Sequence, residues 1–192
     1  MNATLSYALV LQPVDPLACV NTSDLRHTLQ TLGLIKSTSE ASDLPEWHAV
    51  GSNFLEHVTL LGCSPIVYQI IGENNTAPFR IHLPFPLKSP IWYVPEKKVS
   101  LRCPKCHAQD FEWRADVPKW VLDPLGSRRT CAHCAKAFSL HQWRLREEIG
   151  FGRSFLEFWG IHPGEAVPGD TLLEALLGLS GGDWRWFYKS QT

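Results

Sequence analysis

Four of the six cysteines form two pairs with the spacing of metal ligands. Cys103 and Cys106 make one C-x-x-C pair, Cys131 and Cys134 make the other, and 24 residues lie between the pairs. Two residues between thiolates let a tight turn point both sulfurs at one ion, so two such turns supply a tetrahedral set of ligands. We therefore predict one structural Zn²⁺ per chain, while the spacing alone leaves iron open as the metal.

The first pair also matches the string that attaches a c-type haem, because His107 follows Cys106 directly. Two observations oppose that interpretation. The second pair is followed by Ala135 and not by histidine, and no export signal of the kind that haem attachment requires precedes the pairs. The four-cysteine interpretation is therefore favoured over haem.

The metal site is expected to be structural and not catalytic. A hydrolytic zinc site keeps one position open for water and usually includes histidine or a carboxylate, whereas four thiolates close the coordination sphere. His107, His133 and His141 lie near the pairs and could replace a thiolate, but four cysteines suffice. We find no Walker loop, nucleophile elbow or H-E-x-x-H string elsewhere, so no catalytic residue is assigned and a non-enzymatic protein is favoured.

The segment from Lys97 to Arg146, which we call the cysteine module, resembles a zinc ribbon. Val99, Leu101, Phe111 and Trp113 are typical of strands around the first turn, as Phe138 and Leu140 are after the second. Rubredoxin-type turns usually carry glycine after the second cysteine of each pair. His107 and Ala135 stand there in this sequence, and this departure disfavours rubredoxin-type iron. The resemblance implies a structural module and covers no other part of the chain.

The cysteine module is basic, with eleven Lys and Arg against four Asp and Glu, in a chain whose formal net charge is -1. Basic residues interleaved with aromatic ones predict a surface for an acidic partner. The candidate partner-binding residues are Lys105, Arg114, Arg128, Arg129, Trp113 and Trp143. We expect a protein partner, with assembly or maturation of a larger complex as the setting, and nucleic acid is the alternative.

A second candidate site depends on two segments that resemble each other. Residues 52–65 and 153–168 each carry Phe-Leu-Glu and then reach a turn, which predicts a strand and a turn in both. If the segments lie side by side, they could form a pocket with Cys63 as nucleophile or metal ligand, and this hypothesis makes the protein an enzyme or a metal-handling factor. The residues of this hypothetical pocket are Glu56, Cys63, Glu157, His162 and Glu165.

The elements that must position these residues indicate an α+β fold. Strands are predicted at 6–11, 79–83, 155–161 and 184–188, and helices at 24–34 and from Asp170 to Gly181. We expect a small mixed sheet with two or three helices, in which residues 1–96 and 147–192 form one body. The zinc ribbon of residues 97–146 is inserted in that body or appended to it.

Composition agrees with a folded protein, since 44% of the residues are hydrophobic and eight are tryptophan. The N-terminal residues MNATLSYALVLQP lack the basic region and cleavage site of a secretory signal, and no apolar run reaches about 18 residues. We therefore expect a cytoplasmic protein without a membrane span, in which clustered cysteines bind metal more often than they form disulfides.

Overall fold

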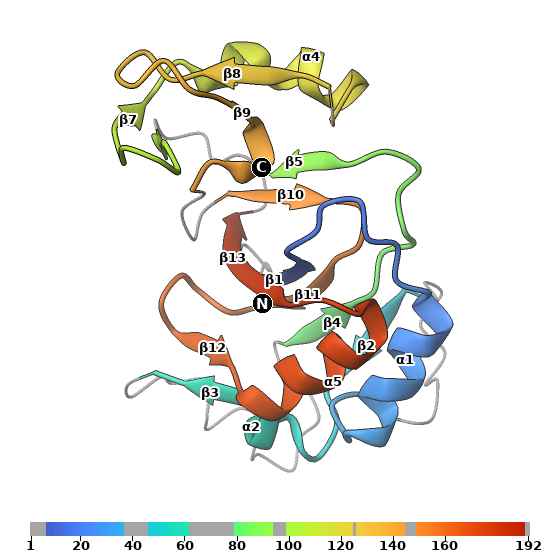
Figure 1. Ribbon diagram of the computed structural model, residues 1–192. Helices are drawn as coiled ribbons and strands as arrows, with labels where there is room; N and C mark the ends of the chain where they lie inside the picture. Colours follow the sequence, from blue (N-terminus) through green and yellow to red (C-terminus); the bar gives the residue numbers. More distant parts are fainter. Residues whose placement is uncertain are drawn as a thin grey trace.

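The computed structural model describes residues 7–36, 46–61, 79–93, 99–124, 126–144 and 149–190, and it confirms the α+β class. Four α-helices and five antiparallel sheets occur in this part of the chain. Figure 1 shows the main sheet in the middle of the molecule, with helices on one side and the cysteine module on the other.

The main sheet has five strands in the order β13-β1-β11-β4-β2. Every pairing in it is antiparallel, where the sequence had led us to expect a mixed sheet. Its strands are β1 Tyr7–Pro13, β2 Trp47–Ala49, β4 Arg80–His82, β11 Leu156–Trp159 and β13 Trp184–Ser190. The predicted strands at 6–11, 79–83, 155–161 and 184–188 all correspond to members of this sheet.

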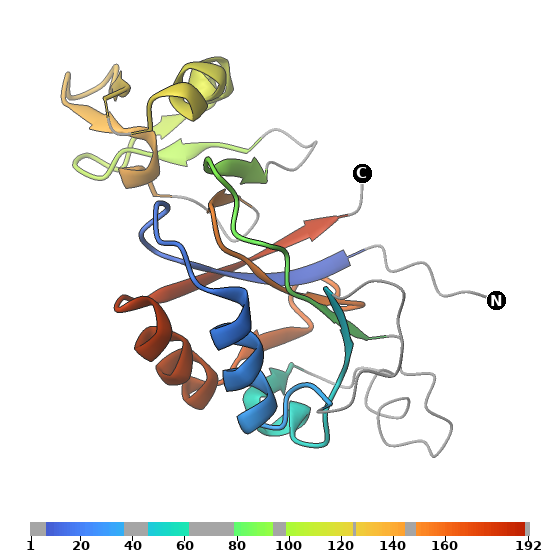
Figure 2. The same ribbon diagram turned by 90° about the vertical axis from the view of Figure 1, so that its right-hand side faces the viewer.

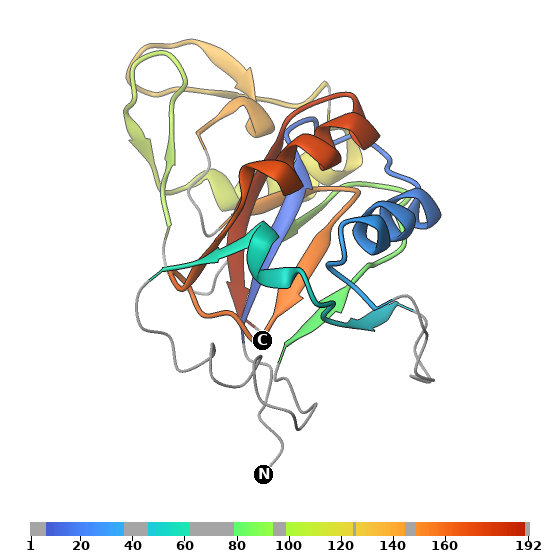
Figure 3. The ribbon, with the colours of Figure 1, turned by 90° about the horizontal axis from the view of Figure 1, so that it is seen from below.

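Three helices cover one face of the main sheet, as Figures 2 and 3 show. They are α1 Thr22–Thr31, α2 Phe54–His57 and α5 Asp170–Ser180. The larger apolar core lies between them and inward-facing strand residues such as Leu9 and Phe158. Burial of apolar side chains on this face supplies the main stabilisation of the body.

The ends of the two long helices follow from their sequences. The Asn21 side chain accepts hydrogen bonds from the backbone N–H groups of Ser23 and Asp24, at 2.7 and 3.4 Å, and so caps α1. Helix α5 ends at Gly181, whose φ of 69° is the left-handed conformation that glycine adopts without strain. Both helices confirm the elements expected at 24–34 and from Asp170 to Gly181.

The first of the two look-alike segments differs from the prediction. Phe54–His57 forms helix α2 and not a strand. Phe54 and His57 are three residues apart, so one helical turn places both side chains on the same face, where both are buried. The following strand β3 Val58–Leu60 pairs with β12 Ala166–Pro168, so the two segments do lie side by side.

The other face of the main sheet carries a second, smaller apolar cluster around Val10, Trp159 and Phe187. A two-stranded sheet of β5 Ile91–Tyr93 and β10 Gly150–Gly152 lies on this side and leads into and out of the cysteine module. Gly150 sits so close to Phe187 that an added Cβ would lie 2.1 Å from the ring. The absence of a side chain at position 150 is therefore required for this packing.

The cysteine module consists of two small hairpins separated by helical turns. Its elements are β6 Leu101–Arg102, β7 Gln109–Asp110, the 3₁₀ helix η1 Trp113–Asp116, α4 Val117–Leu122, β8 Arg128–Thr130, β9 Ala137–Ser139 and the 3₁₀ helix η2 Leu140–Gln142. Four residues lie outside the strands expected for them, since β6 begins at Leu101, β7 ends at Asp110 and β9 ends at Ser139. They are Val99, Phe111, Trp113 and Leu140.

A third apolar cluster fills the cysteine module and continues into β5 and β10. Trp113, Trp120 and Trp143 are its largest fully buried members, and Trp92 and Phe151 pack against Trp120 from outside residues 97–146. The cysteine module therefore shares part of its core with the body.

Within the described residues, no helix combines the length and the apolar character that crossing a bilayer requires.

Candidate metal centre

Each cysteine pair sits in a turn of the same backbone design. The Cys103 N–H donates to Ala108 O at 2.9 Å and the His107 N–H donates to Cys103 O at 3.0 Å. The second turn repeats both bonds at 2.9 Å, from Cys131 to Lys136 O and from Ala135 to Cys131 O. Each turn is followed by the second strand of a hairpin, which fixes the direction in which its two sulfurs point.

The residue after each pair adopts the left-handed conformation, with φ of 60° at His107 and 54° at Ala135. These are the positions where rubredoxin-type turns usually carry glycine. The turn therefore keeps the same backbone without glycine, and it accepts a local strain of about 1–2 kcal/mol at each position. The missing glycines consequently do not distinguish zinc from iron.

The two turns bring all four sulfurs together. Cys103 Sγ lies 3.7 Å from Cys134 Sγ, Cys106 Sγ lies 3.6 Å from Cys131 Sγ, and all four lie within 4.8 Å of one another. A tetrahedral site with metal–sulfur bonds of about 2.3 Å has sulfur–sulfur edges of about 3.8 Å. The separations are far longer than a disulfide bond of about 2.05 Å and fit one tetrahedral metal ion.

The electrostatics of the turns favour binding of a cation. Backbone N–H groups, first that of Cys134 and then that of His133, donate to Cys131 and lower the pKa of its thiol to about 6. The backbone N–H of Ala108 lowers the pKa of Cys106, but burial and the neighbouring thiols outweigh it and raise that pKa to about 12. Thiolates this close repel one another, and a divalent cation removes that repulsion.

The cysteine site is closed toward the core of the cysteine module. Cys103 and Cys131 are buried, Cys106 and Cys134 are partly buried, and the tryptophan-rich core lies beneath them. His107 and His133 are exposed, and His141 Nδ1 lies 3.1 Å from Ser139 Oγ. Four sulfurs that leave no position for water can hold a metal rigidly but give it little Lewis-acid chemistry.

The candidate partner-binding residues separate into exposed and internal groups. Lys105 and Arg128 are exposed and Arg114 is partly exposed. Arg129 forms ion pairs with Asp110 and Asp116, and those carboxylates raise the pKa of its guanidinium, the bond to Asp110 first. Arg129 therefore links β8 to the segment before α4.

Trp113 and Trp143 are only 0% and 2% exposed, so both indoles belong to the core of the cysteine module. The Trp113 Nε1–H donates to Val99 O at 2.8 Å, which fixes that indole further. Stacking of either indole on a partner would require the cysteine module to open.

The four described residues of the hypothetical second pocket do not form one hydrogen-bonded group. Cys63 lies outside the described residues, and Glu56 and His162 are exposed. The Glu165 carboxylate accepts a hydrogen bond from the His162 N–H at 2.9 Å, closing their turn. Among the described residues, no hydrogen bond joins Glu157 to Glu56, His162 or Glu165.

Glu157 instead lies at the centre of a buried polar network that sequence reasoning missed. Its carboxylate accepts hydrogen bonds from Lys189 Nζ at 2.6 Å, Trp159 Nε1 at 2.8 Å, His82 Nδ1 at 2.9 Å and the Tyr93 hydroxyl at 3.4 Å. The Lys189 ammonium also lies 4.5 and 4.7 Å from the ring centroids of Tyr93 and Trp159. A carboxylate within the apolar strand sequence LEFW was the available signal.

The fold and the site define the class only as an α+β protein with a four-cysteine candidate metal centre. Comparisons with protein-family models, with curated proteins and with solved structures found no match in any of the three. The function proposed below therefore rests on the geometry of the site.

Proposed function

We propose that this chain is a non-enzymatic zinc-ribbon protein that uses the exposed basic surface of the cysteine module to dock onto a partner protein. The observation that carries the proposal is the tetrahedral spacing of the four sulfurs, with 3.6 and 3.7 Å between opposite turns. Zinc would hold the two turns rigidly, so that the side chains around them are pre-organised for recognition.

Metal analysis tests the first half of the proposal. Protein purified from cells grown without added metal should contain about one zinc per chain and show no visible absorption. Cys131→Ser should lose most of that zinc, whereas Cys19→Ser, which alters an exposed free cysteine outside the cysteine module, should retain it. A red protein with iron in place of zinc, or full zinc content in Cys131→Ser, contradicts a structural zinc at these four sulfurs.

Charge and exposed apolar side chains on the cysteine module support docking onto a protein. Leu122 at the end of α4 is 87% exposed and Phe111 is 42% exposed. Exposed apolar side chains beside cations are typical of a protein interface, where a central apolar contact is surrounded by polar ones. Among the described residues of the cysteine module, the exposed cations are Arg102, Lys105, Lys119, Arg128, Lys136 and Arg144.

Affinity capture with matched variants tests the docking surface. The native chain should retain a defined partner after crosslinking in its own cells, and Leu122→Ser should lose that partner by removing an apolar contact. Leu177→Ser is the control, because Leu177 is an exposed leucine on α5 of the body. Identical partners for both variants would place the contact outside the cysteine module and contradict the proposal.

Nucleic acid is a second candidate partner because the same exposed cations could contact phosphates. Burial of Trp113 and Trp143 counts against it, because base stacking needs exposed rings. Binding of single-stranded DNA or RNA that weakens steeply with salt, and that is reduced in Lys105→Glu, would favour nucleic acid over a protein partner.

A further inference from the structure

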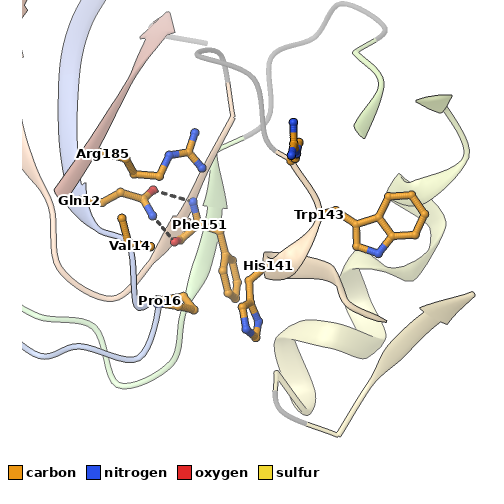
Figure 4. A pocket seen from close by; sticks show the side chains of 8 residues that line it. Gln12, Val14, Pro16, His141, Trp143, Phe151 and Arg185 are labelled. Carbon is orange, nitrogen blue, oxygen red and sulfur yellow. Dashed lines mark hydrogen bonds between the residues drawn. The ribbon is translucent and has the colours of Figure 1, made fainter. Parts of the chain in front are cut away.

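A pocket opens where the cysteine module meets the body, and we call it the junction pocket. Its volume is about 370 Å³, which lies within the roughly 300–1,000 Å³ typical of small-molecule sites. Figure 4 shows Gln12 and Arg185 of the body on one side of it and His141 and Trp143 of the cysteine module on the other. Its lining residues are Gln12, Val14, Pro16, His141, Trp143, Arg144, Phe151 and Arg185.

The Gln12 side chain holds the wall of the junction pocket in place, because it forms the hydrogen bonds that a neighbouring strand would form. Gln12 is 1% exposed, and its amide donates to Phe151 O at 2.5 Å and accepts from the Phe151 N–H at 2.7 Å. These are the two bonds that a neighbouring backbone would make, so the end of β1 is tied to β10. Arg185 adds a bond to Ile149 O at 2.9 Å. The pocket is therefore formed before any ligand arrives.

The polar lining of the junction pocket is cationic. Arg144 and Arg185 lie in it with His141, and among the described residues none of those that line it carries a carboxylate. Burial lowers the pKa of Arg185 to about 10, so its guanidinium remains charged at neutral pH in a poorly solvated place. Burial also lowers the pKa of His141, and the opposing effect of the nearby Asp15 carboxylate is smaller.

The rest of the lining is apolar and rigid. Val14, Pro16 and Phe151 supply a hydrophobic wall, and the ring of Phe151 is fixed by packing 4.4 Å from Trp120 and 4.5 Å from Trp92 between ring centroids. Arg144 is positioned by its backbone, which exchanges hydrogen bonds of 2.9 and 3.3 Å with Arg102 beside the first cysteine turn. Two cations near an apolar wall suit a ligand with one charged and one hydrophobic end.

We propose that the junction pocket binds a small organic oxyanion, whose phosphate or carboxylate group contacts Arg144 and Arg185 and whose hydrocarbon part lies against Val14, Pro16 and Phe151. Planar guanidinium groups offer paired N–H donors to either oxyanion. The ligand would contact the body and the cysteine module at once and thereby fix their relative position. Arg144 belongs both to this site and to the exposed cations of the docking surface proposed above, but binding of a small anion here does not depend on a protein partner.

Calorimetric titration of the full-length, metal-loaded protein tests this inference. The probes are phenyl phosphate, phenylacetate, inorganic phosphate and benzyl alcohol, which separate the type of oxyanion from the contribution of the apolar group. At least one of the two organic anions should bind with a dissociation constant below about 1 mM. Inorganic phosphate should bind more weakly and benzyl alcohol should not bind measurably.

Two exposed basic residues of the cysteine module provide the matched variants. Arg144→Ala should weaken binding by about tenfold or more, since a charge-assisted contact is lost. Lys119→Ala removes the same charge away from the junction pocket and should change the affinity less than about twofold. Circular dichroism and metal content should match the native protein in both variants, because both side chains are exposed.

The inference is overturned if neither organic anion binds with a dissociation constant below about 1 mM. Equal weakening by Arg144→Ala and Lys119→Ala overturns it as well, since that result shows a general charge effect. Metal content and partner capture are separate measurements, so failure of the junction pocket is distinguishable from failure of the proposed function.

Discussion

Replacing Glu157 by glutamine tests how strongly the buried polar network stabilises the main sheet. Glu157 is 1% exposed on the strand between β1 and β4, and its charge is balanced by Lys189 and His82. Glutamine has nearly the same shape, but it removes the charge, and its N–H₂ group cannot replace the oxygen that accepts from the Lys189 ammonium or the Trp159 indole. The substitution therefore isolates the electrostatic role of one carboxylate.

The expected loss of unfolding free energy is large. Removing one member of a buried ion pair costs about 3–5 kcal/mol, because the remaining charge is left buried without its partner. Here that charge is chiefly the Lys189 ammonium, whose side chain is only 14% exposed. For a chain of this length the melting temperature should fall by roughly 6–20 °C.

Urea denaturation followed by tryptophan fluorescence measures this loss. Glu174→Gln is the control, since Glu174 is exposed on α5 and its replacement should change stability by less than about 0.5 kcal/mol. Adding Lys189→Met to Glu157→Gln removes the uncompensated charge and should recover part of the loss. A loss below about 1 kcal/mol for Glu157→Gln, or a double variant no more stable than the single one, would refute the reasoning.

The same network gives stability a defined dependence on pH. Burial raises the pKa of Glu157, but bonds from His82 and Lys189 outweigh it and lower that pKa below its ordinary value. Burial lowers the pKa of His82, but Glu157 and then Glu46 outweigh it and raise that pKa. Each shift contributes stability only while the group stays in the charged form that the network favours.

The two signs define a window of pH. The Glu157 contribution is fully present above its unfolded pKa of about 4.3 and is lost as pH falls through the lower folded value. The His82 contribution is fully present below its unfolded pKa of about 6.5 and is lost as pH rises through the higher folded value. The network should thus stabilise most between about pH 4.3 and 6.5, and in Glu157→Gln the loss of stability below and above this window should be smaller than in the native protein.

Three further substitutions and treatments have definite expected outcomes. Ala135→Gly should tighten metal binding by up to about 1 kcal/mol in competition with a chelator, because glycine adopts the φ of 54° without strain; weaker binding contradicts the turn geometry. Gln12→Leu should cost about 2–5 kcal/mol in urea unfolding, since the N–H and C=O of Phe151 lose their buried partners, and a neutral effect would show that water replaces the amide. Removal of the metal should increase the solvent exposure of Trp113 and Trp143, seen as a red shift of fluorescence, and an unchanged spectrum would show that the core persists without metal.

The local parts of the fold and site could be predicted from the sequence. A C-x-x-C turn, the Asn21 cap and the glycine end of α5 are each determined by residues within one or two turns of backbone. The four cysteines could therefore be assigned from spacing alone. The left-handed turn at Ala135 could not, since sequence preference favours glycine there and the hairpin geometry overrides it.

The parts that depend on register and on burial were not predictable. Glu157 meets His82 because β11 pairs with β4 in one register, and it meets Lys189 across β1, which no spacing along the chain reveals. The sequence shows tryptophans next to cations in the cysteine module, but it does not show that the side chains of Trp113 and Trp143 are buried. Helix α2 was missed because a single buried turn is too short for its periodicity to differ clearly from a strand.

The position of β1 in the main sheet has a consequence for the order in which the chain folds during synthesis. Within the described residues β1 pairs with β11 and β13, so its place in the sheet is completed only after residues 156–190 have left the ribosome. All four cysteines emerge before either of those partners. The metal turns can therefore form while the sheet is still open.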